Sequence, residues 1–432
     1  MRRVTIVLAC LSLILLPLLT RAEGGDLSQP DGGRLRAKKI KNQYIVMLKD
    51  DADVDTDSDY IVKKRKGMLV FKFKHSFKGF VATMSDQEAA TLKDDPKVAD
   101  VVQDEEMYID AKRDGDVTAQ AQILPTGVNR VNAESKTNKG TNVEVAILDT
   151  GIDSGHPDLK SAVLGGISCI KGEAALQDGN GHGTHVAGIV GARNNTIGGV
   201  GVGPEIRLWS VKVLNRQGSG TWSSVICGID WVKSQASHIK VANLSLGGTG
   251  SAGVDCNASP LRKAICNAVN AGVTFVVAAG NESDDVKNHV PAAFPETIAV
   301  SALADSNGTA CGGGASTTYG ADDTFATFSN FATLPADKAR LIGAPGVSIY
   351  STWKNNTYST ISGTSMAAPH VAGAAALYIK ANPGKTPAQV KAALLAAAEP
   401  GNVNFKTECP TGKNSHAGTV THPEGVLRAE GL

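Results

Sequence analysis

Apolar runs that alternate with helical patterns place the strongest constraint on the fold of this 432-residue chain. Continuous apolar, β-branched runs are typical of strands buried on both faces, and helices between them supply the crossovers of a parallel sheet. Helical spacing marks residues 222–233 and 261–270. The strand-like runs are residues 141–148, 207–214, 241–246, 273–278 and 298–302. This alternation predicts an α/β fold with a doubly wound, mostly parallel sheet.

The motif GTSMAAP at residues 363–369 places a serine at the expected start of a helix. An Ala-rich apolar run follows over residues 372–379, which predicts that the helix begins near Ser365. Free backbone N–H groups and the positive end of the helix dipole would stabilise negative charge beside this hydroxyl. Helix capping is the commoner role of a serine in such a position. Two further segments favour a nucleophile instead.

These segments supply a carboxylate and an imidazole. The strand at residues 141–148 ends in Asp149, and α/β sheets place their ligand crevices at the carboxyl ends of strands. His182 follows the Gly-Asn-Gly sequence of residues 179–181 and precedes a helical pattern of small residues. A histidine can remove the serine proton while a buried carboxylate fixes the histidine tautomer. We therefore interpret Asp149, His182 and Ser365 as a catalytic triad.

The motifs DTGID at residues 149–153, HGTHVAG at 182–188 and GTSMAAP at 363–369 resemble the active-site motifs of the subtilases, the subtilisin-like serine proteases. The order Asp, His, Ser along the chain is also that of subtilisin. The sequence AAGN at residues 278–281 is similar to the family's oxyanion motif, in which the Asn281 amide would donate to the oxyanion. The resemblance implies a serine endopeptidase that cleaves proteins and peptides through an acyl-enzyme.

The same resemblance implies where a substrate binds. In the family, two segments pair with the peptide as added strands, and small residues leave room for a large apolar side chain at P1, the residue before the cleaved bond. Residues 282–289 are closer in length to the corresponding stretch of proteinase K than to that of subtilisin. We expect broad specificity with an apolar P1. The matching positions are Gly218, Ser219, Gly220, Trp222, Ser245, Leu246, Gly247, Ala278, Ala279 and Gly280.

One structural calcium ion is a further implication of the resemblance. An all-oxygen shell with few charges suits a hard cation such as Ca²⁺. A solvated Asn/Gly turn is the alternative reading of the loop at residues 193–199. A second, weaker calcium site of the family is not expected, because Leu341 stands where an acidic ligand belongs. The matching ligand positions are Gln122, Asp158, Arg193, Asn195, Ile197 and Gly199.

The first 22 residues have the pattern of a cleaved signal peptide. A basic start precedes an apolar run over residues 4–19, and Thr20-Arg21-Ala22 offers small residues at a cleavage site. The rival interpretation is a membrane anchor, but this run is shorter than the roughly 20 residues that a spanning helix needs. We expect a secreted protein without a stable membrane anchor.

Residues 23–120 are expected to hold a linker, a small α+β domain at about 43–111 and a processing linker. Tyr44-Ile45-Val46 and Lys78-Gly79-Phe80 resemble the subtilase propeptide, which implies an intramolecular inhibitor and folding assistant. The acidic residues 50–59 and basic residues 63–66 are interpreted as solvated faces and a loop.

The processing junction is expected between Asp116 and Ala121, because residues 121–128 resemble a mature subtilisin N-terminus. The peptidase domain would then comprise residues 121–432. No role is assigned to the tail after Gly401.

Six cysteines remain once the signal peptide is removed, and their spacing fits no metal motif. An exported chain meets an oxidising compartment, so disulfides are expected. Cys256 and Cys266 are the most plausible local pair. Cys227 fits a disulfide or a buried free thiol equally well, and the remaining pairing is open.

The formal net charge of +1 gives no electrostatic case for nucleic acid as a partner. We expect a monomer that acts on protein substrates. Two alternatives come from other classes. A catalytically silent binding protein should lack a triad or oxyanion residue, and this chain lacks none. A peptide ligase or transpeptidase commonly forms a thioester through Cys, whereas the nucleophile here is Ser.

Overall fold

The computed structural model describes residues 38–432, apart from residues 110 and 119. The expected signal peptide lies outside these residues. No helix in the described part of the chain has the length and apolar character needed to span a membrane.

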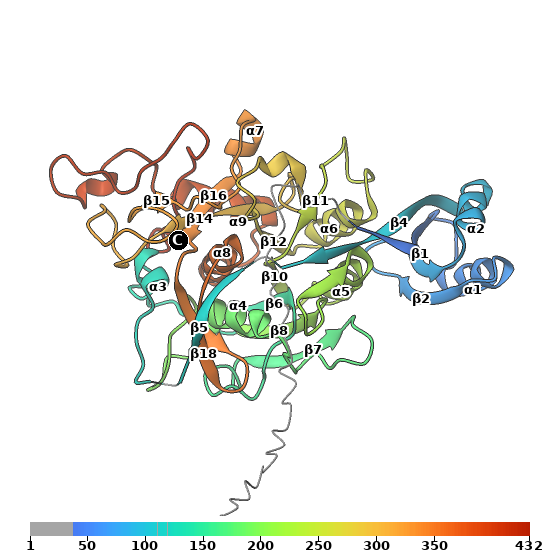
Figure 1. Ribbon diagram of the computed structural model, residues 1–432, viewed down its shortest axis with the longest axis horizontal. Helices are drawn as coiled ribbons and strands as arrows, with labels where there is room; N and C mark the ends of the chain where they lie inside the picture. Colours follow the sequence, from blue (N-terminus) through green and yellow to red (C-terminus); the bar gives the residue numbers. More distant parts are fainter. Residues whose placement is uncertain (1–37, 110, 119) are drawn as a thin grey trace, which may run out of the picture. The chain divides into compact units, whose positions relative to one another are not determined.

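Residues 38–109 form the N-terminal module, an antiparallel sheet in the order β2-β3-β1-β4 with two helices (Figure 1). Alternate β1 residues serve two cores: Val46 packs with the helices of the module, and Ile45 faces the larger domain. The α+β expectation for this region is therefore confirmed. The elements are β1 (Lys39–Leu48), α1 (Val54–Lys64), β2 (Met68–Phe73), β3 (Gly79–Thr83), α2 (Asp86–Thr91) and β4 (Val98–Tyr108).

Helix α1 corrects the interpretation of the charged runs as solvated faces and a loop. Asp53 caps the helix by accepting a hydrogen bond from the Thr56 N–H. Acidic residues occupy the first turn and basic residues the last, as the helix dipole favours. Only a narrow stripe that includes Ile61 and Val62 is buried. The charges thus mark the helix ends rather than the absence of a helix.

The larger domain is built on an eight-stranded sheet in the order β15-β14-β12-β10-β6-β8-β7, with β16 pairing with β14. All pairs are parallel except the one between β14 and β15. The predicted doubly wound, mostly parallel sheet is confirmed. Its strands are β6 (Glu144–Asp149), β7 (Val163–Ser168), β8 (Arg207–Lys212), β10 (Ile239–Leu244), β12 (Thr274–Ala278), β14 (Ile298–Ala304), β15 (Thr324–Phe325) and β16 (Leu341–Pro345).

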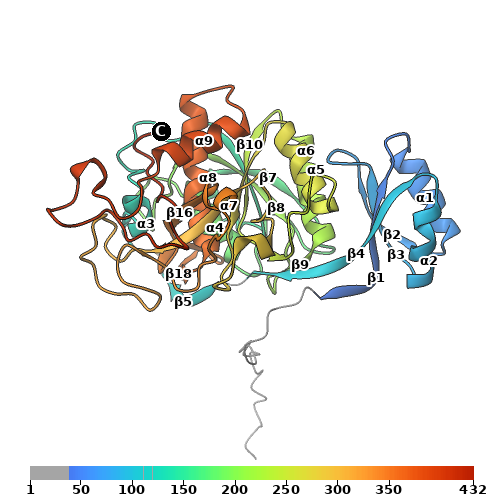
Figure 2. The same ribbon diagram turned by 90° about the horizontal axis from the view of Figure 1, so that it is seen from above.

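Helices cover both faces of this sheet (Figures 1 and 2). Val145 and Ile147 of β6 pack with the layer that contains α4, α8 and α9, whereas Ala146 and Leu148 pack with α5 and α6. Burial of successive residues on opposite faces explains why the strand sequence is continuously apolar. The helices are α3 (Thr126–Arg130), α4 (His182–Gly191), α5 (Trp222–Ser234), α6 (Pro260–Asn270), α7 (Pro335–Lys338), α8 (Thr364–Ala381) and α9 (Pro387–Ala397).

Short strands connect the N-terminal region to the larger domain. β4 pairs with β9 (Ser219–Thr221), and β5 (Lys112–Val117) pairs with β18 (Thr357–Ser362) of a hairpin whose other strand is β17 (Ile349–Trp353). β11 (Gly248–Thr249) pairs with β13 (His289–Val290). The expected processing linker after residue 110 therefore contains a strand.

Three disulfides link the described cysteines. The predicted pair Cys256–Cys266 is confirmed, with an S–S distance of 2.01 Å. Cys227 pairs with Cys169, so its interpretation as a free thiol is wrong. Cys311 pairs with Cys409 of the C-terminal tail, across 98 positions of sequence. The tail is thus bonded covalently to the loop after β14.

Candidate active site

Ser365 is the second residue of α8 and lies beside the end of β10. Its hydroxyl donates to the Ser245 carbonyl oxygen at 3.1 Å. The Ser245 hydroxyl donates in return to the Ser365 carbonyl oxygen at 2.7 Å. These two bonds tie the first turn of α8 to the carboxyl end of a central strand, where the sheet of an α/β protein presents its ligands.

Asp149 and His182 form a buried pair. Asp149 ends β6 and His182 begins α4, and the imidazole Nδ1 lies 2.8 and 2.9 Å from the two carboxylate oxygens. The exposed fractions are 0% for Asp149 and 1% for His182. No described residue forms a hydrogen bond with His182 Nε2. An imidazole held in this way has its second nitrogen ready to accept a proton. The helices that carry His182 and Ser365 pack against each other.

Asn281 lines the same pocket as Ser365 and has a fixed amide orientation. Its Oδ1 accepts hydrogen bonds from the Thr364 N–H at 2.8 Å and from the Thr364 hydroxyl at 2.9 Å. The Thr364 hydroxyl itself accepts from the Gly280 N–H. Because two donors hold the amide oxygen, the NH₂ group is directed away from Thr364. Sequence reasoning missed this positioning role of Thr364.

The end of β4 lies as a strand between the two predicted substrate-pairing segments. Met107 and Tyr108 pair with Gly220 and Ser219 on one side, and Tyr108 also forms a bridge with Gly247 on the other. The Ile109 N–H donates to the Gly218 carbonyl oxygen at 3.1 Å. The N-terminal module thus inserts a peptide strand into the cleft that the sequence predicts for substrates.

Met107 is a buried side chain of the strand that enters the cleft. It is 2% exposed and belongs to the apolar cluster that includes Trp222 and Leu246. Both residues are among the predicted substrate-binding positions. A side chain of the chain's own N-terminal module therefore belongs to the same apolar cluster as two of the predicted substrate-binding residues.

The pocket that Asn281 and Ser365 line also includes the predicted Ala278, Ala279 and Gly280. The sequence analysis compared residues 282–289 with the family by length alone and did not name Glu282 and His289 as members of this lining. The His289 ring lies 3.5 Å from a Glu282 carboxylate oxygen and 3.2 Å from one of Asp284. The pocket consequently combines small apolar walls with a charged border. In the sequence, the signal for Glu282 as a pocket residue is its position directly after Asn281.

A docking contact holds the N-terminal module on α5. The Asp230 carboxylate accepts hydrogen bonds from the N–H groups of Lys74, His75 and Ser76 and from the Ser76 hydroxyl. On α6, the Asn267 amide donates to the Ser76 carbonyl oxygen. These contacts hold the module against α5 and α6, while its last strand, β4, enters the cleft.

Two other histidines near the site are fully buried. Burial lowers the pKa of His185 to about 3 and the pKa of His370 to about 4. His185 Nε2 lies 3.0 Å from the carbonyl oxygens of Ile349 and Ser359. Both rings are neutral at neutral pH, so they act as structural groups rather than as acids or bases.

The six predicted calcium positions meet at one place. Asp158 is fully buried, and its carboxylate accepts from the Asn195 amide at 2.7 Å and from the Tyr358 hydroxyl at 2.8 Å. Burial and the neighbouring Asp158 carboxylate raise the pKa of Tyr358 well above its usual value. No Lys, Arg or His within the described ranges forms an ion pair with Asp158.

Backbone contacts complete this arrangement. The Gln122 amide donates to the Arg193 carbonyl oxygen at 3.0 Å, and the segment around it pairs with Ile197 and Gly199. A buried carboxylate surrounded by neutral oxygen-bearing groups fits the donor set of a hard cation. Elsewhere in the described part, the one close group of three possible metal ligands is Cys256, Cys266 and Glu296, whose cysteines form a disulfide.

Comparisons with known proteins identify the family to which a chain with this site belongs. Residues 140–426 match the model of the Subtilase family, and residues 43–110 match that of Peptidase inhibitor I9. The chain is 36% identical to Subtilisin E of Bacillus subtilis (strain 168) over 389 residues, which cover 88% of this chain and 90% of that protein. It is 41% identical to Subtilisin DY of Bacillus licheniformis over 285 residues, 64% of this chain and 92% of that protein.

The fold comparison gives the same result. The crystal structure of a cold adapted subtilisin-like serine proteinase matches with a TM-score of 0.56 and 32% identity, covering 70% of this chain and 97% of that one. The family model spans more than half of the chain, and the relatives exceed 30% identity over most of their length. The chain therefore belongs to the subtilase family and is a subtilisin-like serine endopeptidase that carries an inhibitor I9 propeptide.

Proposed function

We propose that this protein is a secreted, monomeric endopeptidase that cuts its own propeptide and then hydrolyses protein substrates. The observation that carries the proposal is the strand at residues 106–109, which pairs with both walls of the cleft beside Ser365. A precursor that holds its own chain in this way is arranged for intramolecular cleavage.

Each residue of the site has one role in the proposed reaction. Ser365 attacks the peptide carbonyl while His182 Nε2 removes its proton and later donates it to the leaving amine. Asp149 fixes the imidazole tautomer and stabilises the imidazolium. Asn281 and the Ser365 N–H stabilise the oxyanion of the tetrahedral intermediate. Water then hydrolyses the acyl-enzyme by the same proton path.

The register of the strands favours a first cut between Asp110 and Ala111. Ile109 still pairs with Gly218 in the cleft, and Lys112 already pairs with Ser362, three residues before the nucleophile. The bond to be cut must therefore lie between Ile109 and Lys112. The match to the inhibitor family ends at residue 110, which supports the same bond. A second cut between Asp116 and Ala121 would then leave the N-terminus that the sequence predicts.

The pocket beside Ser365 is proposed to hold a large apolar P1 side chain. Its walls at Ala278, Ala279 and Gly280 carry little side-chain volume, which supports this preference. Glu282 and His289 at its border would contact the tip of a long side chain.

Calcium is proposed to bind at Asp158 together with Gln122, Asn195 and the carbonyl groups of the loop at residues 193–199. Half-turn rotation of the two amides would direct their oxygens toward the ion. A bound ion would supply structural cross-linking of the N-terminal segment to the core, and it contributes no group to the reaction. Asp158 offers the one formal negative charge in this set.

Asp158→Asn should therefore lower thermal stability without a comparable loss of initial activity. A ligand that binds only the native state stabilises it by about 4 kcal/mol at a thousandfold excess over its Kd. We expect millimolar calcium to protect the wild type against heat inactivation and self-digestion, and to protect Asp158→Asn much less. The exposed Asp255→Asn is the matched control and should respond to calcium as the wild type does. Equal protection of all three proteins would place the ion elsewhere.

Labelling with an organofluorophosphonate tests the proposed function directly. Only an activated serine next to oxyanion donors reacts readily with such a reagent. We expect one label on Ser365 and a parallel loss of peptidase activity. Labelling of another residue, or full activity after Ser365 is labelled, contradicts the proposal.

A further inference from the structure

β5 lies where the part of a substrate after the cut bond must run. It pairs antiparallel with β18 from Lys112 opposite Ser362 to Val117 opposite Tyr358. β18 leads directly into α8 and the nucleophile. If the proposed cut lies before Ala111, then Lys112 is the second and Arg113 the third residue after it, P2′ and P3′. The strand is therefore the first occupant of the primed side of the cleft.

The side chain of Arg113 meets a preformed aromatic surface. Its guanidinium carbon lies 4.7 Å from the centre of the Trp353 ring, and its Nε donates to the Ser359 hydroxyl at 3.2 Å. Trp353 ends β17 and is only 5% exposed. A Cβ added to Gly181 would lie 2.3 Å from this ring, so the indole packs tightly against the segment before His182. Tryptophan is the side chain that binds a cation most strongly through its ring face.

The side chain of Lys112 meets a second aromatic ring. Its Nζ lies 5.1 Å from the centre of the Tyr319 ring. Tyr319 packs edge-on against Phe328, with ring centres 5.0 Å apart, and its carbonyl oxygen accepts from the Thr327 N–H. Two successive basic residues of one strand thus each face a different aromatic side chain.

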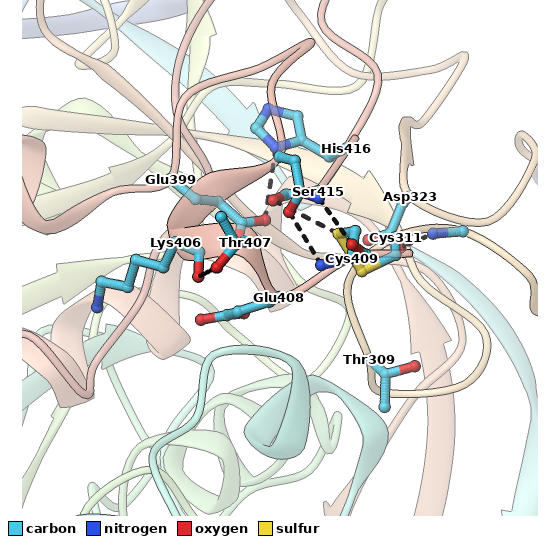
Figure 3. Close-up of a disulfide and its surroundings, with 12 residues drawn as sticks. Thr309, Cys311, Asp323, Glu399, Lys406, Thr407, Glu408, Cys409, Ser415 and His416 are labelled. Carbon is cyan, nitrogen blue, oxygen red and sulfur yellow. Dashed lines mark hydrogen bonds and ion pairs between the residues drawn. A yellow bond between two sulfur atoms is a disulfide. The ribbon is translucent and has the colours of Figure 1, made fainter. Parts of the chain in front are cut away.

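The C-terminal tail holds the loop that presents Tyr319. Cys311 of this loop is bonded to Cys409 and its N–H donates to the Ser415 carbonyl oxygen (Figure 3). At the other end of the loop, Asp323 accepts from Arg130 Nε at 2.7 Å and from the Gly312 N–H. Arg130 is itself paired with Glu399, just before the tail. The Ala417 N–H of the tail also donates to the Asp323 carbonyl oxygen at 2.9 Å, so the tail contacts both ends of the segment that carries Tyr319.

We propose that Tyr319 and Trp353 form a primed-side subsite that selects substrates with basic residues at P2′ and P3′. The proposal rests on the proposed endopeptidase function. During self-processing, the linker residues Lys112 and Arg113 occupy this subsite as part of the first substrate. Later substrates add a strand to β18 in their place. The tail after Gly401, to which the sequence analysis assigned no role, positions the loop that carries Tyr319.

Internally quenched peptides with one common acyl half test this selection. Their P2′–P3′ residues are Lys-Arg, Lys-Ala, Ala-Arg, Ala-Ala and Glu-Glu. A solvent-exposed cation over a ring contributes about two- to fivefold per position, so kcat/KM for Lys-Arg should exceed that for Ala-Ala by roughly 4- to 25-fold. Glu-Glu should be the poorest. The readout is this ratio within each enzyme, which a general loss of activity does not change.

Variants assign each position to its ring. Tyr319→Leu should remove the preference for Lys at P2′ and keep that for Arg at P3′, while the matched control Tyr319→Phe keeps both. Trp353→Leu should do the reverse, and Trp353→Met, which also lacks a ring, serves if the leucine variant does not fold. The double variant Cys311→Ala/Cys409→Ala should behave like Tyr319→Leu.

Failure of this inference is distinguishable from failure of the proposed function. An enzyme that labels at Ser365 and cleaves all five peptides at similar rates overturns the subsite alone. Loss of both preferences in Tyr319→Phe, or of neither in Tyr319→Leu and both Trp353 variants, also overturns it. Absence of labelling and of hydrolysis of every peptide instead contradicts the endopeptidase mechanism.

Discussion

Ser365→Ala is expected to lower kcat by on the order of 10⁶, the loss that removal of the nucleophile causes in subtilisin itself. The Ser365 hydroxyl is hydrogen-bonded to the Ser245 carbonyl oxygen after β10. Within the described residues, Ser365 is the one serine in the first turn of α8. Without this hydroxyl, His182 has no group to deprotonate for attack. The remaining rate should come only from oxyanion stabilisation and substrate binding.

The measurement needs a mature-length variant. Its precursor can be cut in the linker by a second protease that is afterwards removed, and hydrolysis of a peptide anilide is then followed. Wild type treated identically is the control. A decrease of less than about 10³ would contradict the role of Ser365, because removal of a working nucleophile exceeds that figure by far.

Asn281→Ala is expected to lower kcat by about 10²–10³, or roughly 2.7–4 kcal/mol of transition-state stabilisation, as loss of the equivalent donor does in subtilisin. KM should change little, because the donor acts on the oxyanion and not on the bound peptide. Two hydrogen bonds from Thr364 hold the Asn281 oxygen, so the amide donor is oriented before substrate binds.

Steady-state kinetics of Asn281→Ala against the control Asn382→Ala checks this expectation. Asn382 donates to the Tyr378 carbonyl oxygen at the far end of α8, and its loss should leave kcat unchanged. A raised KM with an unchanged kcat in Asn281→Ala would assign the amide to ground-state binding instead.

The central sheet and the catalytic residues could be predicted because their signals are local. Between Glu144 and Asp149, strand β6 is apolar because Val145 and Ala146 face different helix layers, and Asp149 ends the strand. The motifs around His182 and Ser365 carry their own glycines and small residues. The pairing Cys256–Cys266 spans only ten positions, which made it predictable as well.

Features that depend on distant partners could not be predicted. β5 is polar, and its strand conformation comes from pairing with β18, more than 200 positions later. The Cys169–Cys227 disulfide joins two elements whose neighbourhood only the fold creates. Helix α1 was not predicted because few of its residues, among them Ile61, are buried, and charged residues occupy both of its ends. Acidic residues at the start of a helix and basic residues at its end stabilise it through the helix dipole. A high density of charged residues therefore does not by itself indicate a loop.

Intact-mass analysis of purified precursors tests the central claim most directly, namely that Ser365 cuts its own chain in the cleft that β4 enters. Wild type and Ser365→Ala precursors are folded over a hundredfold range of concentration in the absence of other proteases. We expect the wild type to yield a fragment that begins at Ala111, at a rate independent of concentration, while Ser365→Ala stays intact. Cleavage of Ser365→Ala at the same bond and rate would contradict the account.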